Sequence, residues 1–206
     1  MIAIIDSGGA NIASVRFALE RLGVDSVLTA DPAVISVAER VILPGVGAAP
    51  VAMAQLARAG LVECIRGLTQ PVLGICLGMQ LLFERSEEGD TPLLGLVGGT
   101  CGAFDPGMGL TVPHMGWNRL LPRGEGRHPL LSGVEDGAHV YFVHSYAAPV
   151  SADTVASCSY GVDFTALVAR GNFMGRSSTP NVQARSGHAS LAIFWHCRLA
   201  GKADVT

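Results

Sequence analysis

The sequence predicts one α/β domain: a mostly parallel central sheet flanked by helices, with extra antiparallel strands in the second half. Up to about Pro92, apolar strand-like runs alternate with amphipathic helical runs, which is typical of a parallel sheet. After Pro92, short strand-like runs follow one another between Gly and Pro turns. The chain has 206 residues, 49% of them hydrophobic, which suffices for one substantial core but not for two. A single domain over residues 1–206 is therefore expected.

The first half opens with strands and helices in alternation. Residues 2–6 (IAIID) form an apolar run typical of a buried strand, and residues 11–23 carry apolar side chains at helical spacing before a closing glycine. Residues 40–47 (RVILPGVG) predict a second strand that ends in a Pro-Gly turn. Residues 48–68 then predict a helix with an interruption near Gly60.

A third strand is predicted at residues 71–75 (PVLGI), and it leads into a helix over residues 77–85 (LGMQLLFER). Strands that alternate with helices need crossover connections, so these strands are expected to run parallel. Strand-like runs of the second half, expected to extend or flank the sheet, cover residues 93–104, 117–121, 139–146, 153–160 and 164–175.

Composition excludes several classes of function. A net charge of −3 and a pI near 6.0 leave no basic footprint for nucleic acid. The apolar start, MIAIIDSGG, is too short to cross a membrane and lacks the features of a signal peptide, so we expect a cytoplasmic protein without membrane contact. The cysteines are odd in number and form no C-x-x-C pair, so no disulfide framework, metal site or cofactor is expected. They are Cys64, Cys76, Cys101, Cys158 and Cys197.

The stretch GICLG at residues 74–78 has the spacing of a nucleophile elbow, G-x-C-x-G, between a strand and a helix. The tight turn needs glycine at Gly74 and Gly78 because side chains there would collide. It would lift the Cys76 sulfur out of the sheet, and the helix start would favour a thiolate and offer the Leu77 amide to an oxyanion. The alternative is that Cys76 is only a small apolar residue at a strand end.

A second glycine motif, LPGVG at residues 43–47, ends the neighbouring predicted strand. Its glycines would let a peptide plane turn its N–H group toward the same cleft, which would complete an oxyanion hole around Gly45 and Val46. The carboxyl edge of a parallel sheet is where α/β proteins place their sites. An ordinary Pro-Gly turn without a binding role is the alternative.

These motifs carry a family resemblance. The segments PGVGA, PVLGICLGMQLLFERSEEG, PHMGWN and YFVHSY, with DSGGANIASV near the N-terminus, resemble the glutaminase subunit of imidazole glycerol phosphate synthase. The resemblance covers roughly residues 1–175. It implies the fold of the class I, triad-type glutamine amidotransferases and an enzyme of histidine biosynthesis that hydrolyses glutamine through a cysteinyl thioester. It also implies a heterodimer with a cyclase subunit, which uses the ammonia to make imidazole glycerol phosphate and an aminoimidazole carboxamide ribotide.

The resemblance assigns roles to residues of this sequence. Cys76 matches the nucleophile, and Asn11 and Trp117 match positions at the mouth of the ammonia path, which faces the cyclase. The oxyanion hole is expected from Gly45, Val46 and Leu77, and the glutamine contacts from Gly47, Gln80, His144, Ser145 and Tyr146. A solvated helix position for Gln80 and a core position for Trp117 are the alternatives. The family does not use the position of His144 as its catalytic base.

The chain departs from the family where the catalytic base is expected. The family's histidine and glutamate lie in a late motif, typically G-V-Q-F-H-P-E, on a strand end beside the elbow. There the imidazole takes the thiol proton and returns it to departing ammonia, and the carboxylate orients the imidazole. Residues 169–175 (ARGNFMG) lead up to this motif, but the histidine and glutamate positions hold Thr179 and Asn181. Neither side chain transfers protons in this way near neutral pH.

The missing motif can be recovered in a shifted reading frame. Back-translation from Arg176, read two nucleotides later with suitable synonymous codons, encodes F-I-H-P-E and a tail of the family's kind. We therefore expect residues 176–206 to be a frameshifted, aberrant tail. One alternative is a subunit without glutaminase activity that only binds the cyclase. Another is a cysteine hydrolase of the dienelactone kind, but its base would have to be His188 or His196, which both lie in the tail.

Overall fold

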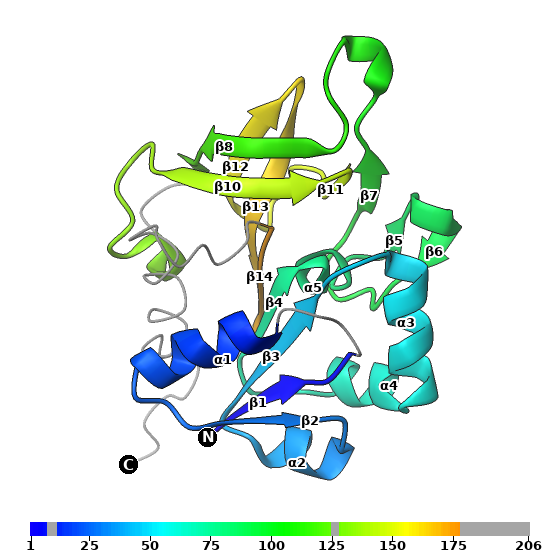
Figure 1. Ribbon diagram of the computed structural model, residues 1–206, viewed down its shortest axis with the longest axis vertical. Helices are drawn as coiled ribbons and strands as arrows, with labels where there is room; N and C mark the ends of the chain where they lie inside the picture. Colours follow the sequence, from blue (N-terminus) through cyan, green and yellow to red (C-terminus); the bar gives the residue numbers. More distant parts are fainter. Residues whose placement is uncertain (8–11, 125–127, 178–206) are drawn as a thin grey trace.

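The computed structural model describes residues 1–7, 12–124 and 128–177, and a mixed sheet forms its centre (Figure 1). Its eight strands are hydrogen-bonded in the order β2-β1-β3-β4-β14-β13-β12-β9. They are β1 (Ile2–Ile5), β2 (Ser26–Thr29), β3 (Arg40–Gly45), β4 (Val72–Cys76), β9 (Leu121–Pro122), β12 (Thr154–Tyr160), β13 (Val162–Arg170) and β14 (Phe173–Arg176). The pairs from β2 to β14 are parallel, and the pairs from β14 to β9 are antiparallel. The predicted fold class is confirmed.

Helices of the first half cover both faces of the parallel strands. They are α1 (Ile12–Arg21), α2 (Pro32–Val37), α3 (Ala49–Arg58), α4 (Leu61–Arg66) and α5 (Leu77–Gln80). Along β1, Ile2 and Ile4 face the core cluster that includes α1, whereas Ala3 and Ile5 face the one that includes α2, α3 and α4. The interruption expected near Gly60 is confirmed, because Gly60 has φ 67° and separates α3 from α4.

The helix expected over residues 77–85 ends after one turn as α5, so this prediction was wrong beyond that turn. The carbonyl groups of residues 81–83 accept hydrogen bonds from the backbone N–H groups of residues 94–97. A continued helix would need those carbonyls for its own next turn. The same bonds explain why only β7 (Thr100–Ala103) forms a strand within the run predicted at residues 93–104.

Among the elements that the sequence did not predict are β2 and α2. Only two of the four residues of β2 (SVLT) are apolar, and all four are partly or fully exposed, so the segment lacks the longer apolar run of a buried strand. The start of α2 did carry a signal: Asp31 accepts a hydrogen bond from the Ala33 N–H at 2.8 Å, and Pro32 follows at the first helical position. Aspartate followed by proline therefore indicated the start of a helix, although the helix is too short to show apolar periodicity.

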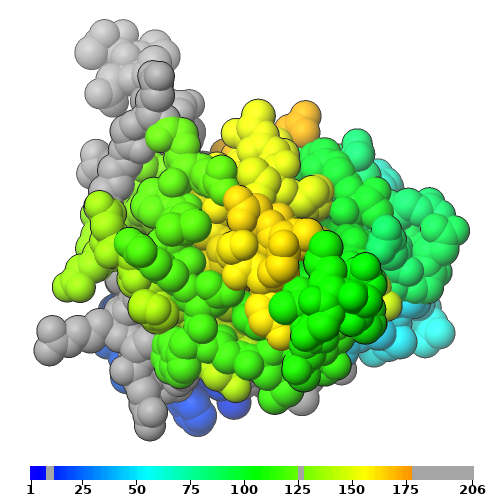
Figure 2. Space-filling view, turned by 90° about the horizontal axis from the view of Figure 1, so that it is seen from above, coloured from blue at the N-terminus to red at the C-terminus, as the bar shows by residue number. Residues whose placement is uncertain are grey.

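Two smaller sheets lie outside the central one. Strand β10 (His139–His144) pairs antiparallel with β8 (His114–Arg119). The other sheet contains β5 (Arg85–Ser86), β6 (Thr91–Pro92), β7 and β11 (Tyr146–Ala147), and short 3-10 turns are η1 (Glu88–Asp90), η2 (Pro106–Met108) and η3 (Pro129–Leu131). Figure 2 shows this end of the molecule formed by the green and yellow residues of the second half. Within the described ranges, no helix is long and apolar enough to cross a membrane.

Candidate active site

Strand β4 ends at Cys76, where the chain turns sharply into α5. Cys76 has φ 54° and ψ −118°, a backbone conformation that residues with side chains rarely adopt. It pairs in register with Gly45 at the carboxyl edge of the parallel strands. The structure therefore contains the tight strand-to-helix turn that the G-x-C-x-G spacing predicted.

Close backbone contacts explain the glycines around the elbow. A Cβ atom on Gly78 would lie 1.9 Å from the carbonyl oxygen of Leu43, and one on Gly74 would lie 2.5 Å from the carbonyl oxygen of Gly78. A Cβ atom on Gly45 would lie 2.4 Å from the nitrogen of Gly78. Ordinary van der Waals contact begins at 3.4 Å, so only glycine fits at these positions. The contacts hold the turn after β3 against the elbow.

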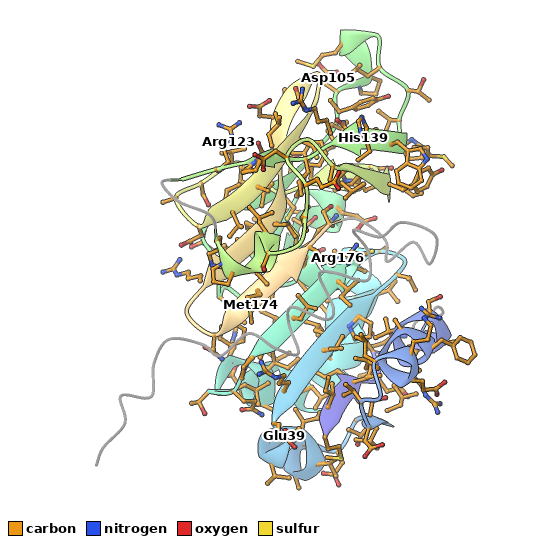
Figure 3. All side chains as sticks on the ribbon, turned by 90° about the vertical axis from the view of Figure 1, so that its left-hand side faces the viewer. Glu39, Asp105, Arg123, His139, Met174 and Arg176 are labelled. Carbon is orange, nitrogen blue, oxygen red and sulfur yellow. The ribbon has the colours of Figure 1, made fainter. Side chains whose placement is uncertain are left out.

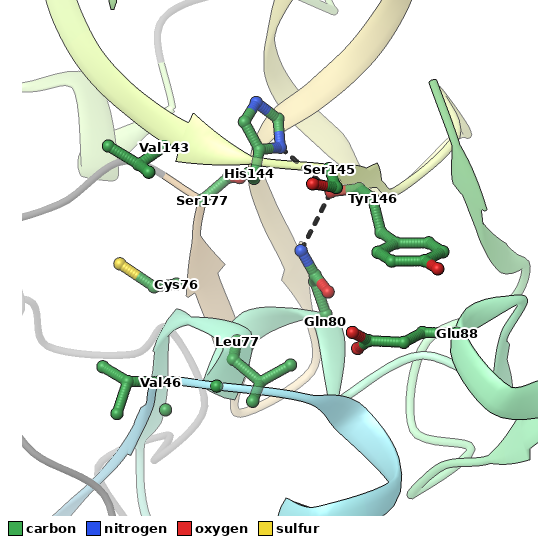
Figure 4. Close-up of a pocket in the computed structure, with 12 residues that line it drawn as sticks. Val46, Cys76, Leu77, Gln80, Glu88, Val143, His144, Ser145, Tyr146 and Ser177 are labelled. Atoms are coloured by element: carbon green, nitrogen blue, oxygen red, sulfur yellow. Dashed lines mark hydrogen bonds between the residues drawn. The ribbon is translucent and has the colours of Figure 1, made fainter. Parts of the chain in front are cut away.

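A cavity of about 400 Å³ opens beside Cys76 (Figure 4). This size suits a small-molecule ligand. The lining brings together Cys76 and every residue predicted for the oxyanion hole and the glutamine contacts: Gly45, Val46, Gly47, Leu77, Gln80, His144, Ser145 and Tyr146. Gln80 is 7% exposed, so the alternative of a solvated helix position is wrong. Glu88, Val143 and Ser177 also line the cavity, although no pattern in the sequence placed them there.

Hydrogen bonds from α5 and from the end of β10 to the first residue of β11 hold one wall of the cavity. Gln80 Nε2 donates to the carbonyl oxygen of Tyr146 at 3.0 Å, and His144 Nδ1 bonds to the same oxygen at 2.9 Å (Figure 4). The other ring nitrogen of His144 lies 3.0 Å from His114 Nδ1. Burial lowers the pKa of His144 to about 4. Because both ring nitrogens already have partners, His144 is not arranged as a base for Cys76.

Glu88 places a carboxylate in the cavity. Its Oε2 atom accepts a hydrogen bond from the Ala49 N–H at 2.7 Å, at the first residue of α3. Glu88 lies in η1, so the turn after β5 and the start of α3 together set the position of this carboxylate. No pattern around Glu88 in the sequence indicates this, because the meeting of η1 with α3 is a tertiary contact.

The Cys76 thiol lies in surroundings that oppose its ionisation. Burial raises its pKa to about 11, and the Arg176 guanidinium acts in the opposite direction. Arg176 is 3% exposed at the end of β14, in register with Ile75 (Figure 3). Within the described part of the chain, no hydrogen bond joins the Cys76 sulfur to a histidine. A thiol in this state needs a base before it becomes a good nucleophile.

The predicted base positions, Thr179 and Asn181, lie outside the described residues, and so does Asn11 at the expected partner face. Ser177, directly after β14, lines the cavity, and its N–H donates to the Ala166 carbonyl. Strand β14 therefore leads the chain to the elbow, where the family motif is expected.

An exposed apolar surface, called here the β8–β10 face, adjoins the cavity. It consists of Met115 and Trp117 on β8 with Tyr141 and Val143 on β10, which face each other as cross-strand pairs. Trp117 is 52% exposed, so the alternative of a core position is wrong. Met115 is 62% exposed and Val143 is 50% exposed. Val143 also lines the cavity, so the β8–β10 face reaches its rim.

Comparisons of sequence with known proteins show the family. The family model for glutamine amidotransferase class-I matches residues 3–181. Imidazole glycerol phosphate synthase subunit HisH of Xanthomonas euvesicatoria pv. vesicatoria (strain 85-10) is 54% identical over 193 residues, which are 94% of this chain and 96% of that protein. The same subunit of Xylella fastidiosa (strain Temecula1) is 52% identical over the same shares of both chains.

Solved structures agree with the fold. A crystal structure of a glutamine amidotransferase matches with a TM-score of 0.71 at 16% identity, over 95% of this chain and 97% of that one. The glutaminase domain of Trypanosoma brucei CTPS matches with a TM-score of 0.64 at 12% identity, over 95% of this chain and 93% of that one. At these identities the likeness concerns the fold alone.

Proposed function

Because the chain belongs to the class I glutamine amidotransferases, and among them to the HisH subunits that serve histidine biosynthesis, we propose that it acts on glutamine through a thioester at Cys76. The observation that carries this is the strained elbow, which sets Cys76 in a cavity with all the described residues expected to bind glutamine. The ammonia passes to a cyclase subunit that makes imidazole glycerol phosphate and an aminoimidazole carboxamide ribotide. This heterodimer works in the cytoplasm.

In this proposal the Cys76 sulfur adds to the carboxamide carbon of glutamine. The carbonyl oxygen becomes an oxyanion, which the Leu77 N–H and an N–H near Gly45 and Val46 stabilise. The register pairing of Cys76 with Gly45 supports this, because it sets both turns at one end of adjacent strands. Collapse of the intermediate breaks the C–N bond and needs a proton for the ammonia; water then hydrolyses the thioester to glutamate.

The amino-acid head of glutamine binds at the polar side of the cavity. The Glu88 carboxylate lines the cavity and suits its ammonium group, because an ammonium group donates charge-assisted hydrogen bonds to a carboxylate. Gln80 and the backbone of residues 144–146 supply further neutral hydrogen-bonding groups for the head. Glu88→Gln should therefore weaken glutamine binding while leaving the reactivity of Cys76 toward small alkylating reagents unchanged.

Proton transfer is the step of glutamine hydrolysis for which this chain lacks the family's catalytic residues. The Cys76 thiol has a pKa of about 11, and Thr179 and Asn181 occupy the family's histidine and glutamate positions. Loss of a triad base typically lowers turnover by several orders of magnitude, whereas binding and the oxyanion hole persist. The same observation favours the second candidate function, a subunit that binds the cyclase without glutaminase activity.

The tail from residue 176 to residue 206 is part of the same proposal: it is the product of a frameshift after Gly175. The support is the family motif that reappears in the shifted frame, whereas the chain itself carries Thr179 and Asn181. Sequencing of the gene around the Gly175 codon tests this. A locus whose shifted frame does not encode His-Pro-Glu contradicts it.

The cyclase is proposed to dock on the β8–β10 face, together with the segment around Asn11. Exposed aromatic and methionine side chains are typical of the centres of protein interfaces, and Trp117 and Met115 are both more than half exposed. Val143 belongs both to this face and to the cavity, which gives ammonia a short path toward the partner.

The test uses the full chain mixed with its cyclase and measures glutamate release from glutamine. The variants are Cys76→Ser and the double variant Thr179→His/Asn181→Glu, which restores the family's catalytic histidine and its orienting glutamate. The double variant should release glutamate at least about a hundredfold faster than the unmodified chain, and Cys76→Ser should release none. An unmodified chain as fast as the double variant contradicts the role of these positions, and activity in Cys76→Ser contradicts the nucleophile.

A chloroketone analogue of glutamine separates thiol competence from turnover. Alkylation needs no proton for a departing ammonia, so the unmodified chain should be labelled at Cys76 even when turnover is slow. Mass spectrometry of the tryptic peptide reports the labelling. If glutamine binds and Cys76 remains unlabelled, the chain is a binding-only subunit.

A further inference from the structure

Two imidazoles lie behind one wall of the cavity, and hydrogen-bond chemistry determines where their protons are. The Tyr146 carbonyl oxygen can only accept, so His144 Nδ1 at 2.9 Å must carry a hydrogen. In a neutral ring, His144 Nε2 is then without a hydrogen and accepts. His114 Nδ1 lies 3.0 Å from that nitrogen, so His114 donates. The hydrogen bonds therefore all point in one direction: His114 donates to His144, and His144 donates to the Tyr146 carbonyl.

The surroundings keep both rings neutral. His114 is 3% exposed and stacks on Tyr160 with ring centroids 4.0 Å apart, and Phe104 meets His144 edge-on at 5.1 Å. Burial lowers the pKa of both histidines. In the part of the chain that the structure describes, no hydrogen bond or ring contact joins either imidazole to a carboxylate.

We propose that His114 and His144 are positioning residues that fix the Gln80 amide for binding the ammonium group of glutamine. The Tyr146 oxygen accepts from His144 and, at 3.0 Å, from Gln80 Nε2. With its NH₂ group held there, Gln80 offers its amide oxygen to a ligand, and in Figure 4 this oxygen points toward Glu88. The amide oxygen and the carboxylate together make an acceptor pair suited to an ammonium group.

The inference rests on the proposed function, since glutamine is the ligand. The His144 side chain acts here without touching the substrate: it sets the direction of the Tyr146 carbonyl, and that carbonyl sets the direction of Gln80. This hydrogen-bond relay from His114 through His144 to Tyr146 also explains why His144, which lines the same cavity as Cys76, does not serve as its base. His144 Nε2 already accepts a hydrogen bond from His114.

The binding experiment measures dissociation constants by calorimetry for glutamine and for glutaramate, which lacks the α-amino group. His144→Leu removes the donor to Tyr146, whereas His144→Asn keeps an N–H near the position of Nδ1; His139→Gln changes an exposed histidine on the same strand as a control. We expect His144→Leu to weaken glutamine binding about tenfold and glutaramate binding little. His144→Asn and His139→Gln should stay within about threefold of the unmodified chain. Equal glutamine affinity in His144→Leu and the unmodified chain overturns the positioning role.

A second measurement needs no variant. Imidazole nitrogen NMR on the unmodified chain should find His144 neutral at pH 7 with its proton on Nδ1, and a proton on Nε2 overturns the relay. If the unmodified chain binds no glutamine, the proposed function and the ammonium role both fail. The tautomer of His144 then still decides whether the relay exists.

Discussion

Replacement of Gly78 by alanine should disrupt the elbow. The added Cβ atom would lie 1.9 Å from the Leu43 carbonyl oxygen, whereas ordinary contact begins at 3.4 Å. The two backbones would have to separate by about 1.5 Å. Neither can move freely, because Leu43 lies in β3 between β1 and β4, and Gly78 lies within α5 against Gly45 and Gly74.

The expected destabilisation follows from this overlap. Overpacking a well-filled core typically costs about 1–3 kcal/mol, and a collision between backbones belongs at the upper end of this range. For a chain of this size, 3 kcal/mol corresponds to a fall in Tm of roughly 6–12 °C. Differential scanning calorimetry measures that fall, and chloroketone labelling measures how far the variant retains a reactive Cys76.

Gly67→Ala is the matched control. Gly67 has φ −84°, and an added Cβ atom would meet only the Glu63 carbonyl oxygen at 3.4 Å and the Cys64 carbonyl oxygen at 3.7 Å. Its Tm should therefore change by no more than about 2–4 °C, which corresponds to about 1 kcal/mol. If Gly78→Ala matches this control in both Tm and labelling, the steric account of the elbow is refuted.

Four further predictions concern charge, pH and the partner face. Iodoacetamide labelling of Cys76, followed by peptide mass spectrometry, should rise about tenfold per pH unit between pH 8 and 10, because its thiol has a pKa of about 11. Arg176→Met removes the nearby cation, so the pKa of Cys76 should rise further and labelling at pH 9 should slow about tenfold; unchanged labelling contradicts this. Burial raises the pKa of the Cys158 thiol from 9.0 to about 12. Its contribution to the free energy of unfolding is therefore complete below pH 9 and is lost as the pH rises toward 12. In urea unfolding between pH 8 and 11, the free energy of unfolding should fall less in Cys158→Val than in the unmodified chain. Trp117→Ala should weaken cyclase binding at least tenfold by calorimetry, whereas Val37→Ala, at a 79% exposed position of α2, should not.

The sequence predicted well wherever one short segment determines its own conformation. Glycines at positions 74 and 78 around Cys76 indicated a tight turn, and the structure has that turn with φ 54° at Cys76. The glycine near residue 60 indicated a helix break, and the break is present. These predictions succeeded because tight turns and positive φ angles require glycine, so the positions of glycine in the sequence indicate such turns before the neighbouring strands are known.

The sequence predicted poorly where distant segments compete for the same backbone groups. The apolar spacing of residues 77–85 fits a helix, but residues 94–97 take the carbonyls that the helix would use. Glu88 was missed for a related reason: its carboxylate reaches the cavity because η1 packs beside the start of α3. Neither contact has a local signature in the sequence.

The sequence by itself determined the family, the elbow and the absence of a histidine and a glutamate at the positions of Thr179 and Asn181. Only the tertiary structure decided what surrounds Cys76: the buried Arg176, the Glu88 carboxylate and the wall that His144 holds through Tyr146. The physical reason is the separation along the chain of the residues that determine each property. Turn sterics and side-chain identity are properties of adjacent residues, whereas burial, pKa values and hydrogen-bond direction depend on strands that are far apart in the sequence and meet only when the sheet forms.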